Sequence, residues 1–330
     1  MGEEGGLSKF ESSQPMILIA AMLFGLLIGP VFSGIASISN SVVYFSLVGL
    51  MFGIALGTPL GSVAKSFARL RFFGIAWSVN FIIVPLVGFL LASIFLSETP
   101  LIFLGFILYV VTPCTDWFLV FTGMAKGDVP LGLALLPTQL VLQILLIPVY
   151  LLLFTGEIVP FQLSALIETV IIFIILPFTL SILTNRAIIR TKGAEWKEKR
   201  MKNVPISIQT IALALAIFFM FAGQTQVIID NVGPLSVVLL PVLIFFAISY
   251  VLSHYISRWL RLRYEECALL TCTSIARNSP LALAIAFGLF PNLPLVQVAI
   301  IIGVIVELPV LVLVVKALNK GRPTYCGRGL

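Results

Sequence analysis

The chain has 330 residues, of which 60% are hydrophobic and only 10% are charged, and it carries a net charge of +6. Its mean hydropathy of +1.14 is far above what a water-soluble fold can bury. Apolar stretches of roughly 20 residues, each able to cross about 30 Å of hydrocarbon as a helix, recur along the chain. The alternation of polar and apolar residues that is typical of barrel strands is absent. The composition therefore predicts an all-α polytopic membrane protein.

Prolines, glycines and charges divide the chain into ten predicted transmembrane helices. They are residues 15–37, 42–62, 72–96, 101–124, 130–155, 163–185, 205–229, 234–257, 266–290 and 294–316. The first apolar run has no small-residue cleavage site behind a basic start, so we expect it to remain as a span. The predicted domains are an N-terminus (1–14), a first five-helix repeat (15–160), a second five-helix repeat (161–320) and a tail (321–330).

Every one of the 20 Lys and Arg residues except Arg277 falls in segments on one side of these spans. The opposite loops carry Glu98, Glu157 and Asp230 and no basic residue. The positive-inside rule therefore predicts a multi-pass protein of the cell membrane with both termini in the cytoplasm.

The positive charge is explained by topology, so the expected partner is the lipid bilayer and no nucleic acid. The longest hydrophilic stretch, residues 185–203, is too short for a nucleotide-binding domain, and the chain has no GxxxxGK[ST] loop. We expect no ATPase domain in this chain.

Five is an odd number of helices, so two homologous halves must have opposite orientations in the membrane. Aligning Pro130–Pro148 with Pro294–Pro309 places Gln143 on Glu307, with a proline following each. The pattern predicts two inverted repeats.

The fourth and ninth predicted helices are polar in the middle. They read TPCTDW at Thr112–Trp117 and TCTSIARNSP at Thr271–Pro280. Proline and clustered polar residues at membrane depth are typical of broken helices, whose freed backbone groups line a binding site between repeats. We expect these two broken helices to cross.

Asp116 and Arg277 are charged residues in the middle of these two helices. A central charge costs at least roughly 2.5 to 3.5 kcal/mol on insertion scales and is usually paired. We expect the two to meet, either as a structural ion pair or as a functional one, with Asp116 carrying a proton or cation. Arg277 would then be its counter-charge or an anion-binding group. Glu307 resembles a proton-coupling carboxylate.

Cys114 lies two residues before Asp116. A thiolate is a soft ligand for metals or metalloids, although a lone cysteine in an apolar helix also simply packs. Tyr109 is expected to pack. Side chains that could coordinate an ion or substrate, or serve only as interhelical hydrogen-bonding groups, are Asn80, Gln139, Gln143, Asn278 and Ser279. No constellation of nucleophile, base and oxyanion donors indicates an enzyme, and no cofactor is expected beyond a coupling proton or sodium ion.

The stretch PCTDWFLVFTGMAKGD, Pro113–Asp128, resembles the fourth span of the arsenite-efflux carriers of the arsenical-resistance family, within the bile acid:sodium symporter superfamily. In those carriers a cysteine stands twelve residues before a lysine, as Cys114 and Lys126 do here. Three further stretches are similar to family segments: SVNFIIVPL (Ser78–Leu86), LALAIA (Leu281–Ala286) and VELPVL (Val306–Leu311). The resemblance covers nearly the whole chain.

This resemblance implies a secondary active transporter that exports arsenite or a related metalloid by proton antiport. The arsenite-binding cysteine of the family corresponds to Cys114, which would be the tentative metalloid ligand, and its acidic residue corresponds to Glu307. Asp116 or Glu307 would carry the proton.

Two departures from the family pattern affect the site. Pro113 stands where the family usually has arginine, and residues 279–282 stand where it has Asn-Asn-Phe-Glu. An acid in the fourth helix, Asp116, and an arginine in the ninth, Arg277, have appeared instead. We interpret this as a charge pair whose members have exchanged helices.

The alternative within the superfamily is sodium-coupled uptake of an organic anion, with Arg277 facing the carboxylate of the substrate. Sodium-ligand candidates would be Thr115, Asp116, Asn278, Gln143 and Glu307. A passive channel would need a polar stripe along several helices, whereas polarity here is concentrated at one depth. The candidate substrate-binding residues for a small inorganic or organic anion are Cys114, Arg277, Asn278 and Ser279, and the candidate ion-coupling residues are Asp116, Glu307, Thr115 and Gln143.

Overall fold

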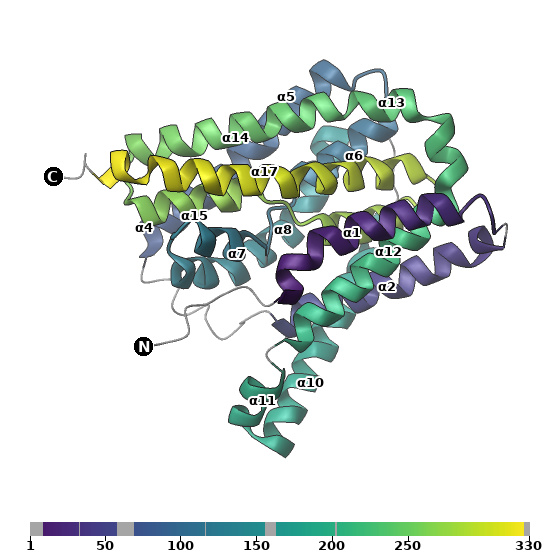
Figure 1. Cartoon of the computed structure of the whole chain (residues 1–330), viewed down its shortest axis with the longest axis horizontal. Coiled ribbons are helices and arrows are strands. Elements are labelled where there is room, and N and C mark those ends of the chain that lie inside the picture. The colour runs from purple at the N-terminus through teal and green to yellow at the C-terminus, as the bar shows by residue number, and fades with distance from the viewer. Residues whose placement is uncertain are drawn as a thin grey trace. The chain divides into compact units, whose positions relative to one another are not determined.

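The computed structural model describes residues 9–32, 34–57, 69–115, 117–155, 163–201 and 203–326, and these residues form helices, short turns and one isolated β-bridge. The helices are α1 (Lys9–Ile28), α2 (Ile35–Gly57), α4 (Leu70–Ser78), η3 (Val79–Ile83), α5 (Val84–Phe95), α6 (Pro100–Val110), α7 (Trp117–Met124), α8 (Val129–Thr155), α9 (Leu163–Val170), η4 (Ile171–Ile175), α10 (Leu176–Lys192), α11 (Ala194–Met201), α12 (Val204–Asp230), α13 (Val232–Val237), α14 (Leu239–Trp259), α15 (Tyr264–Ile275), α16 (Ser279–Leu289) and α17 (Pro294–Cys326) (Figure 1).

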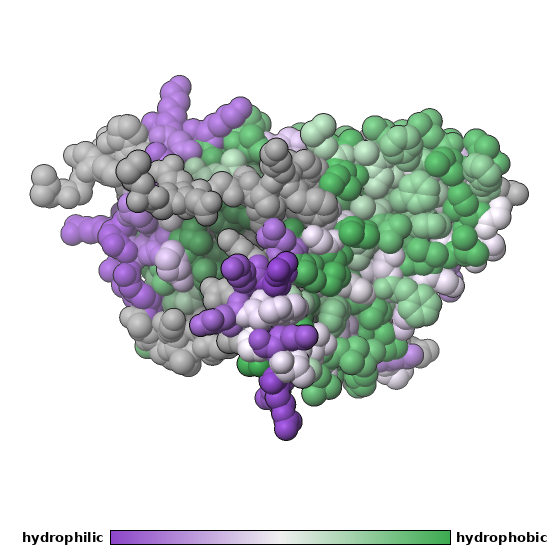
Figure 2. Space-filling model, turned by 60° about the horizontal axis from the view of Figure 1, so that its bottom comes forward, coloured by the Kyte–Doolittle hydropathy of each residue, from purple (hydrophilic) through white to green (hydrophobic). Residues whose placement is uncertain are grey.

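The predicted all-helical class is confirmed. Within the described residues, seven helices are long and apolar enough to cross a membrane, and three shorter apolar helices accompany them. In the face drawn in Figure 2, hydrophobic side chains cover a broad continuous area and hydrophilic side chains gather apart from it. The count of ten spans and the inverted repeat stay predictions.

Several helix boundaries differ from the predicted ones. The first predicted span ran to residue 37, but α1 ends at Ile28 because Gly29 precedes Pro30, and a residue before proline disfavours the helical conformation. In contrast, α10 continues to Lys192 and α17 to Cys326, beyond the apolar stretches. Hydropathy marks where an apolar stretch ends, and a helix can continue past that point into polar sequence.

The chain forms two compact units, each assembled from segments that are distant in the sequence. The first unit comprises Met1–Thr58, Phe161–Val232 and Leu283–Pro294, and the second comprises Pro59–Pro160, Gly233–Ala282 and Leu295–Leu330. The predicted division into 15–160 and 161–320 concerns a duplication of sequence and stays a prediction.

In the first unit, α12 packs along both α1 and α2 (Figure 1). Gly25 in α1 and Gly29 in the turn that follows α1 form a GxxxG pattern. Both glycines face α12. A Cβ atom added at Gly25 would lie 2.6 Å from the carbonyl oxygen of Phe218 and 3.0 Å from Cβ of Phe221. Small residues allow such close backbone approach between helices in lipid, where dispersion replaces the hydrophobic effect as the packing force.

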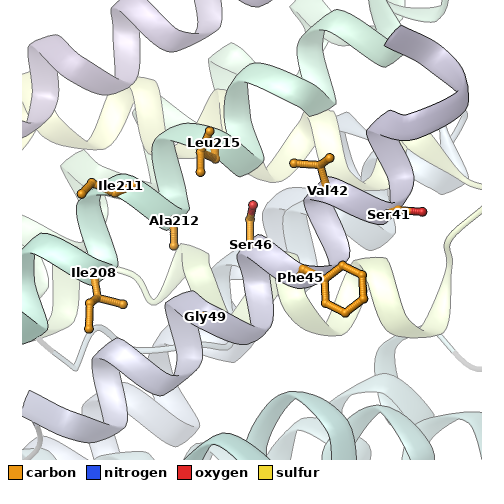
Figure 3. A pocket seen from close by; sticks show the side chains of 9 residues that line it. All are labelled: Ser41, Val42, Phe45, Ser46, Gly49, Ile208, Ile211, Ala212 and Leu215. Carbon is orange, nitrogen blue, oxygen red and sulfur yellow. The ribbon is translucent and has the colours of Figure 1, made fainter. Parts of the chain in front are cut away.

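A groove of about 510 Å³ lies between α2 and α12 (Figure 3). Its wall is largely apolar, and the Ser46 side chain points toward the space between the two helices. The lining residues are Ser41, Val42, Phe45, Ser46, Gly49, Ile208, Ile211, Ala212 and Leu215. With no charged group in its lining, this groove has none of the chemistry predicted for the transport site.

In the second unit, α4, η3 and α5 form a continuous helical segment with one π-helical turn. Pro85 has no N–H to donate to the carbonyl of Phe81, four residues earlier. The buried Tyr150 hydroxyl of α8 donates to this carbonyl oxygen at 2.6 Å. A side chain from another helix therefore satisfies the backbone group that the proline leaves unpaired.

The AKGD stretch forms the turn between α7 and α8. Lys126 has a positive φ of 57°. A Cβ at Gly127 would lie 2.7 Å from a methyl carbon of Thr122 and 3.1 Å from Cβ of Ala268 in α15. Asp128 Oδ1 accepts the N–H of Leu131 at 3.0 Å, which caps α8. The motif thus has a structural role in fixing α7, α8 and α15 together.

Gly25→Val should lower the free energy of unfolding by about 1–3 kcal/mol, because the contacted atoms are backbone atoms and a Cβ atom of α12, which cannot rotate away. Gly49→Val is the matched control, since an added Cβ at Gly49 meets nothing within 4 Å. Thermal unfolding of the two purified variants in detergent checks this. Equal unfolding temperatures would show that close α1–α12 packing does not depend on glycine.

Candidate functional site

Two helical segments are interrupted within the second unit, where the sequence predicted. The described residues 111–115 lie between α6 and α7, and residues 276–278 separate α15 from α16. Pro113 and Arg277 form an isolated antiparallel β-bridge between the two interruptions. We call residues 111–115 and 276–279 the junction.

Backbone hydrogen bonds tie the two interruptions together. The N–H of Cys114 donates to the carbonyl of Ala276 at 3.1 Å, and the N–H of Asn278 donates to the carbonyl of Thr112 at 2.7 Å. Each interruption therefore supplies the backbone partners that the other has lost by leaving the helix.

Four helix ends approach the junction. The C-termini of α6 and α15 carry partial negative charge, and the N-termini of α7 and α16 carry partial positive charge. Such ends are where transporters with interrupted helices hold charged substrates and ions.

The Arg277 side chain is buried, with 2% of its surface exposed. Its guanidinium donates through Nη1 to the carbonyl of Val110 at 2.9 Å and through Nη2 to the carbonyls of Thr273 and Ser274 at 3.0 and 2.6 Å. Nε donates to the carbonyl of Ile275 at 3.4 Å. These carbonyls belong to the last residues of α6 and α15.

A guanidinium has five N–H groups. Four of those of Arg277 are directed at backbone oxygens. One N–H remains for any other acceptor, too few for a bidentate grip on a carboxylate. Asp116 lies outside the described residues, so its predicted pairing with Arg277 stays a prediction.

Glu307 of α17 reaches the junction and is 1% exposed. Its Oε1 accepts the backbone N–H of Arg277 at 3.0 Å, and its Oε2 accepts the Tyr109 hydroxyl at 2.7 Å. Tyr109 therefore has a hydrogen-bonding role in addition to the packing role that the sequence predicted. The ring also packs on Gly303, where an added Cβ would lie 2.9 Å from two ring carbons.

Asn278 fixes the start of α16. Its Oδ1 accepts the N–H of Leu281 at 3.2 Å, and its Nδ2 donates to Thr115 Oγ1 at 3.2 Å. Thr115 and Ser279 are also buried. Thr115 contacts Asn278 through this hydrogen bond, and Ser279 follows Asn278 in the sequence. The structure therefore places two candidate substrate-binding residues, Asn278 and Ser279, and the candidate ion-coupling residue Thr115 at the junction.

Cys114 is also at the junction, and it is 1% exposed. Cys267 and Cys272 are further buried thiols of the same unit, in α15. None of these three cysteines forms a disulfide bond with another described residue. Among the described residues, no group of three or more His, Cys, Asp or Glu could hold a metal ion.

A second polar cluster lies between η3, α8 and α15. Thr273 Oγ1 accepts the amide of Gln139 at 2.9 Å and the amide of Asn80 at 3.2 Å. Gln143, one turn after Gln139, is fully buried, and its amide nitrogen and oxygen have no hydrogen-bond partner among the described residues. The structure gives Gln143 no hydrogen bond to Glu307, the residue it matched in the predicted repeat.

The apolar helices and the interrupted segments define the class: an all-helical, multi-pass membrane protein. Residues 44–231 match the Sodium Bile acid symporter family. The chain belongs to this family and is a secondary transporter, which agrees with the expectation that it is not an enzyme. The predicted resemblance is confirmed.

Curated relatives extend over most of the chain. The arsenical-resistance protein Acr3 of Corynebacterium glutamicum is 25% identical over 334 residues, covering 94% of this chain and 89% of that protein. Acr3 of Alkaliphilus metalliredigens is 25% identical over 347 residues, covering 97% and 95%. A probable chloroplastic sodium/metabolite cotransporter, BASS3 of Oryza sativa subsp. japonica, is 24% identical over 242 residues, covering 72% of this chain and 54% of that protein.

Tyr109→Phe should lower the free energy of unfolding by about 1–3 kcal/mol, because it removes the buried hydroxyl that donates to Glu307 Oε2. Tyr150→Phe is the control, since its hydroxyl bonds a neutral carbonyl and its loss should cost less, about 1 kcal/mol. Thermal unfolding measures both. A smaller loss for Tyr109→Phe than for Tyr150→Phe would contradict a charge-supporting role for Tyr109.

Proposed function

We propose that this transporter exports arsenite or a related metalloid in exchange for protons. The observation that carries the proposal is the burial of Cys114 at the junction, in a chain similar over nearly its full length to two arsenical-resistance proteins. Sulfur is the soft ligand that trivalent metalloids and soft metals prefer.

In this proposal the cargo meets Cys114 and the polar groups next to it. Asn278 and Ser279 start α16, so the partial positive charge of this helix end favours an electron-rich oxygen ligand of the cargo. Thr115, which accepts from Asn278, holds the short segment that carries Cys114. The thiol would supply affinity, and the amide and hydroxyl groups would orient the bound species.

Asp116 or Glu307 is the proposed proton carrier. The tyrosine hydroxyl and the backbone N–H that donate to Glu307 are neutral groups. Protonation of its carboxylate would weaken both hydrogen bonds, and one of them reaches the backbone of the junction directly. Proton binding would thereby be coupled to the geometry around Cys114, as alternating access requires.

The second candidate is sodium-coupled uptake of an organic anion. It is favoured by the fully buried Gln143, whose amide has no partner among the described residues, and by the Asn80 oxygen, which has none either. Amide oxygens are hard ligands of the kind that sodium and other hard cations bind. The relative named as a probable sodium/metabolite cotransporter fits this candidate.

The proposal includes ten spans in two inverted repeats and a cell-membrane location with both termini in the cytoplasm. The basic segments that support this orientation include α11 and the end of α10. In everted vesicles, export from the cell would then appear as uptake.

Everted vesicles with an imposed proton gradient should accumulate arsenite, and Cys114→Ser should abolish this uptake because oxygen is a harder and weaker ligand for the metalloid. Cys267→Ser is the matched control, because Cys267 is an equally buried thiol of the same unit outside the junction, and it should transport normally. Radiolabelled or mass-detected arsenite gives the uptake rate.

Unchanged arsenite uptake by the Cys114→Ser variant would exclude this thiol as the ligand. Sodium-dependent accumulation of an organic anion, with Cys114→Ser harmless and Gln143→Leu inactive, would instead support the symporter candidate.

A further inference from the structure

The guanidinium of Arg277 occupies the place where two helix C-termini meet. Carbonyl oxygens from the end of α6 and the end of α15 surround it at 2.6–3.4 Å. Both helix ends carry partial negative charge, so their convergence favours a cation between them. In transporters with interrupted helices, half-helix C-termini and unwound carbonyls are what coordinate a sodium ion.

We propose that this carbonyl cradle is a cation site which the chain fills with its own side chain. Arg277 acts as a tethered cation that holds α6 and α15 together permanently, where a dissociable inorganic cation could otherwise bind. Transport therefore needs no sodium ion at the cradle. The transport part of this inference rests on the proposed function, whereas the cation-binding part does not.

The surroundings of Arg277 suit a positive charge more than a neutral donor. The centre of the guanidinium lies 5.7 Å from the ring centroid of Phe245, within cation–π distance. The accepting groups are carbonyls at helix C-termini, whose partial charge adds to each hydrogen bond. Burial of a cation is unfavourable unless such partners compensate it, and here they come from both interrupted helices.

The side chain and the backbone of Arg277 have separate tasks. The side chain fills the cradle, while the backbone N–H donates to Glu307 and the residue bridges to Pro113. A substitution at this position removes the cation and keeps the N–H that Glu307 accepts. The contribution of the cation can therefore be measured without removing the hydrogen bond to the carboxylate.

The binding experiment uses purified Arg277→Ala in detergent and compares its thermal unfolding in choline, sodium and guanidinium chloride at millimolar concentrations. We expect a lower unfolding temperature than that of the unaltered chain in choline, and a partial recovery with guanidinium or sodium. Arg71→Ala is the control, because Arg71 also donates to a helix-terminal carbonyl, that of Leu260 at 2.6 Å, but is exposed. Neither the control nor the unaltered chain should respond to the cation.

The transport experiment separates charge from hydrogen bonding. Arg277→Lys keeps a cation with fewer donors, and Arg277→Gln keeps an amide donor without charge. In sodium-free buffer the lysine variant should transport about tenfold faster than the glutamine variant, a difference of about 1.4 kcal/mol. If the alanine variant does not fold, the comparison of the lysine and glutamine variants still tests the proposal.

An alanine variant whose stability is the same in all three salts would overturn the proposal. Equal transport by the lysine and glutamine variants would also overturn it, provided that the unaltered chain takes up arsenite. A failure of arsenite uptake in the unaltered chain would contradict the proposed cargo alone. The response of Arg277→Ala to guanidinium and sodium would still report on the cradle, because unfolding needs no substrate.

Discussion

Two helices that stop in the middle of an apolar segment leave backbone carbonyl and amide groups that hydrocarbon cannot hydrogen-bond. In this protein α6 and α15 both end in this way, and the guanidinium of Arg277 donates hydrogen bonds to carbonyl groups at both ends. Two backbone hydrogen bonds join residues 112–114 to residues 276–278. The rest of the candidate site depends on this mutual satisfaction, because it fixes Cys114, Asn278 and Glu307 around one point.

The same constraint connects structure to transport. Glu307 is bound through the backbone N–H of Arg277 and through Tyr109, so a change in its protonation acts directly on the junction. Cys114 is tied to that junction by its own N–H. In the proposed mechanism, the proton carrier Glu307 and the soft ligand Cys114 are therefore hydrogen-bonded to the neighbouring backbone groups of Arg277 and Ala276. The chain belongs to the Sodium Bile acid symporter family, a family of secondary transporters.

The sequence was sufficient to predict helices and the two interruptions, because apolar length and mid-segment prolines are local signals. The sequence did not predict which residues far apart in the chain are hydrogen-bond partners. Tyr109 and Glu307 are 198 residues apart, and nothing near Tyr109 distinguishes it from the aromatic residues that only pack. Arg277 stood out as the one basic residue outside the basic loops, but its acceptors are backbone carbonyls, which every residue has. A side chain partner such as Asp116 was therefore the natural expectation, and the carbonyl cradle could be found only from the fold.

In the proposed mechanism the cargo binds at the junction, next to Cys114. The most direct test is the alkylation rate of Cys114 by a small membrane-permeant maleimide in a variant whose other cysteines, Cys267, Cys272 and Cys326, are replaced by serine. Arsenite should slow this alkylation in a saturable manner, because a thiol bound to the metalloid cannot attack the reagent. An alkylation rate that is the same with and without arsenite, in protein that remains folded, would contradict the account.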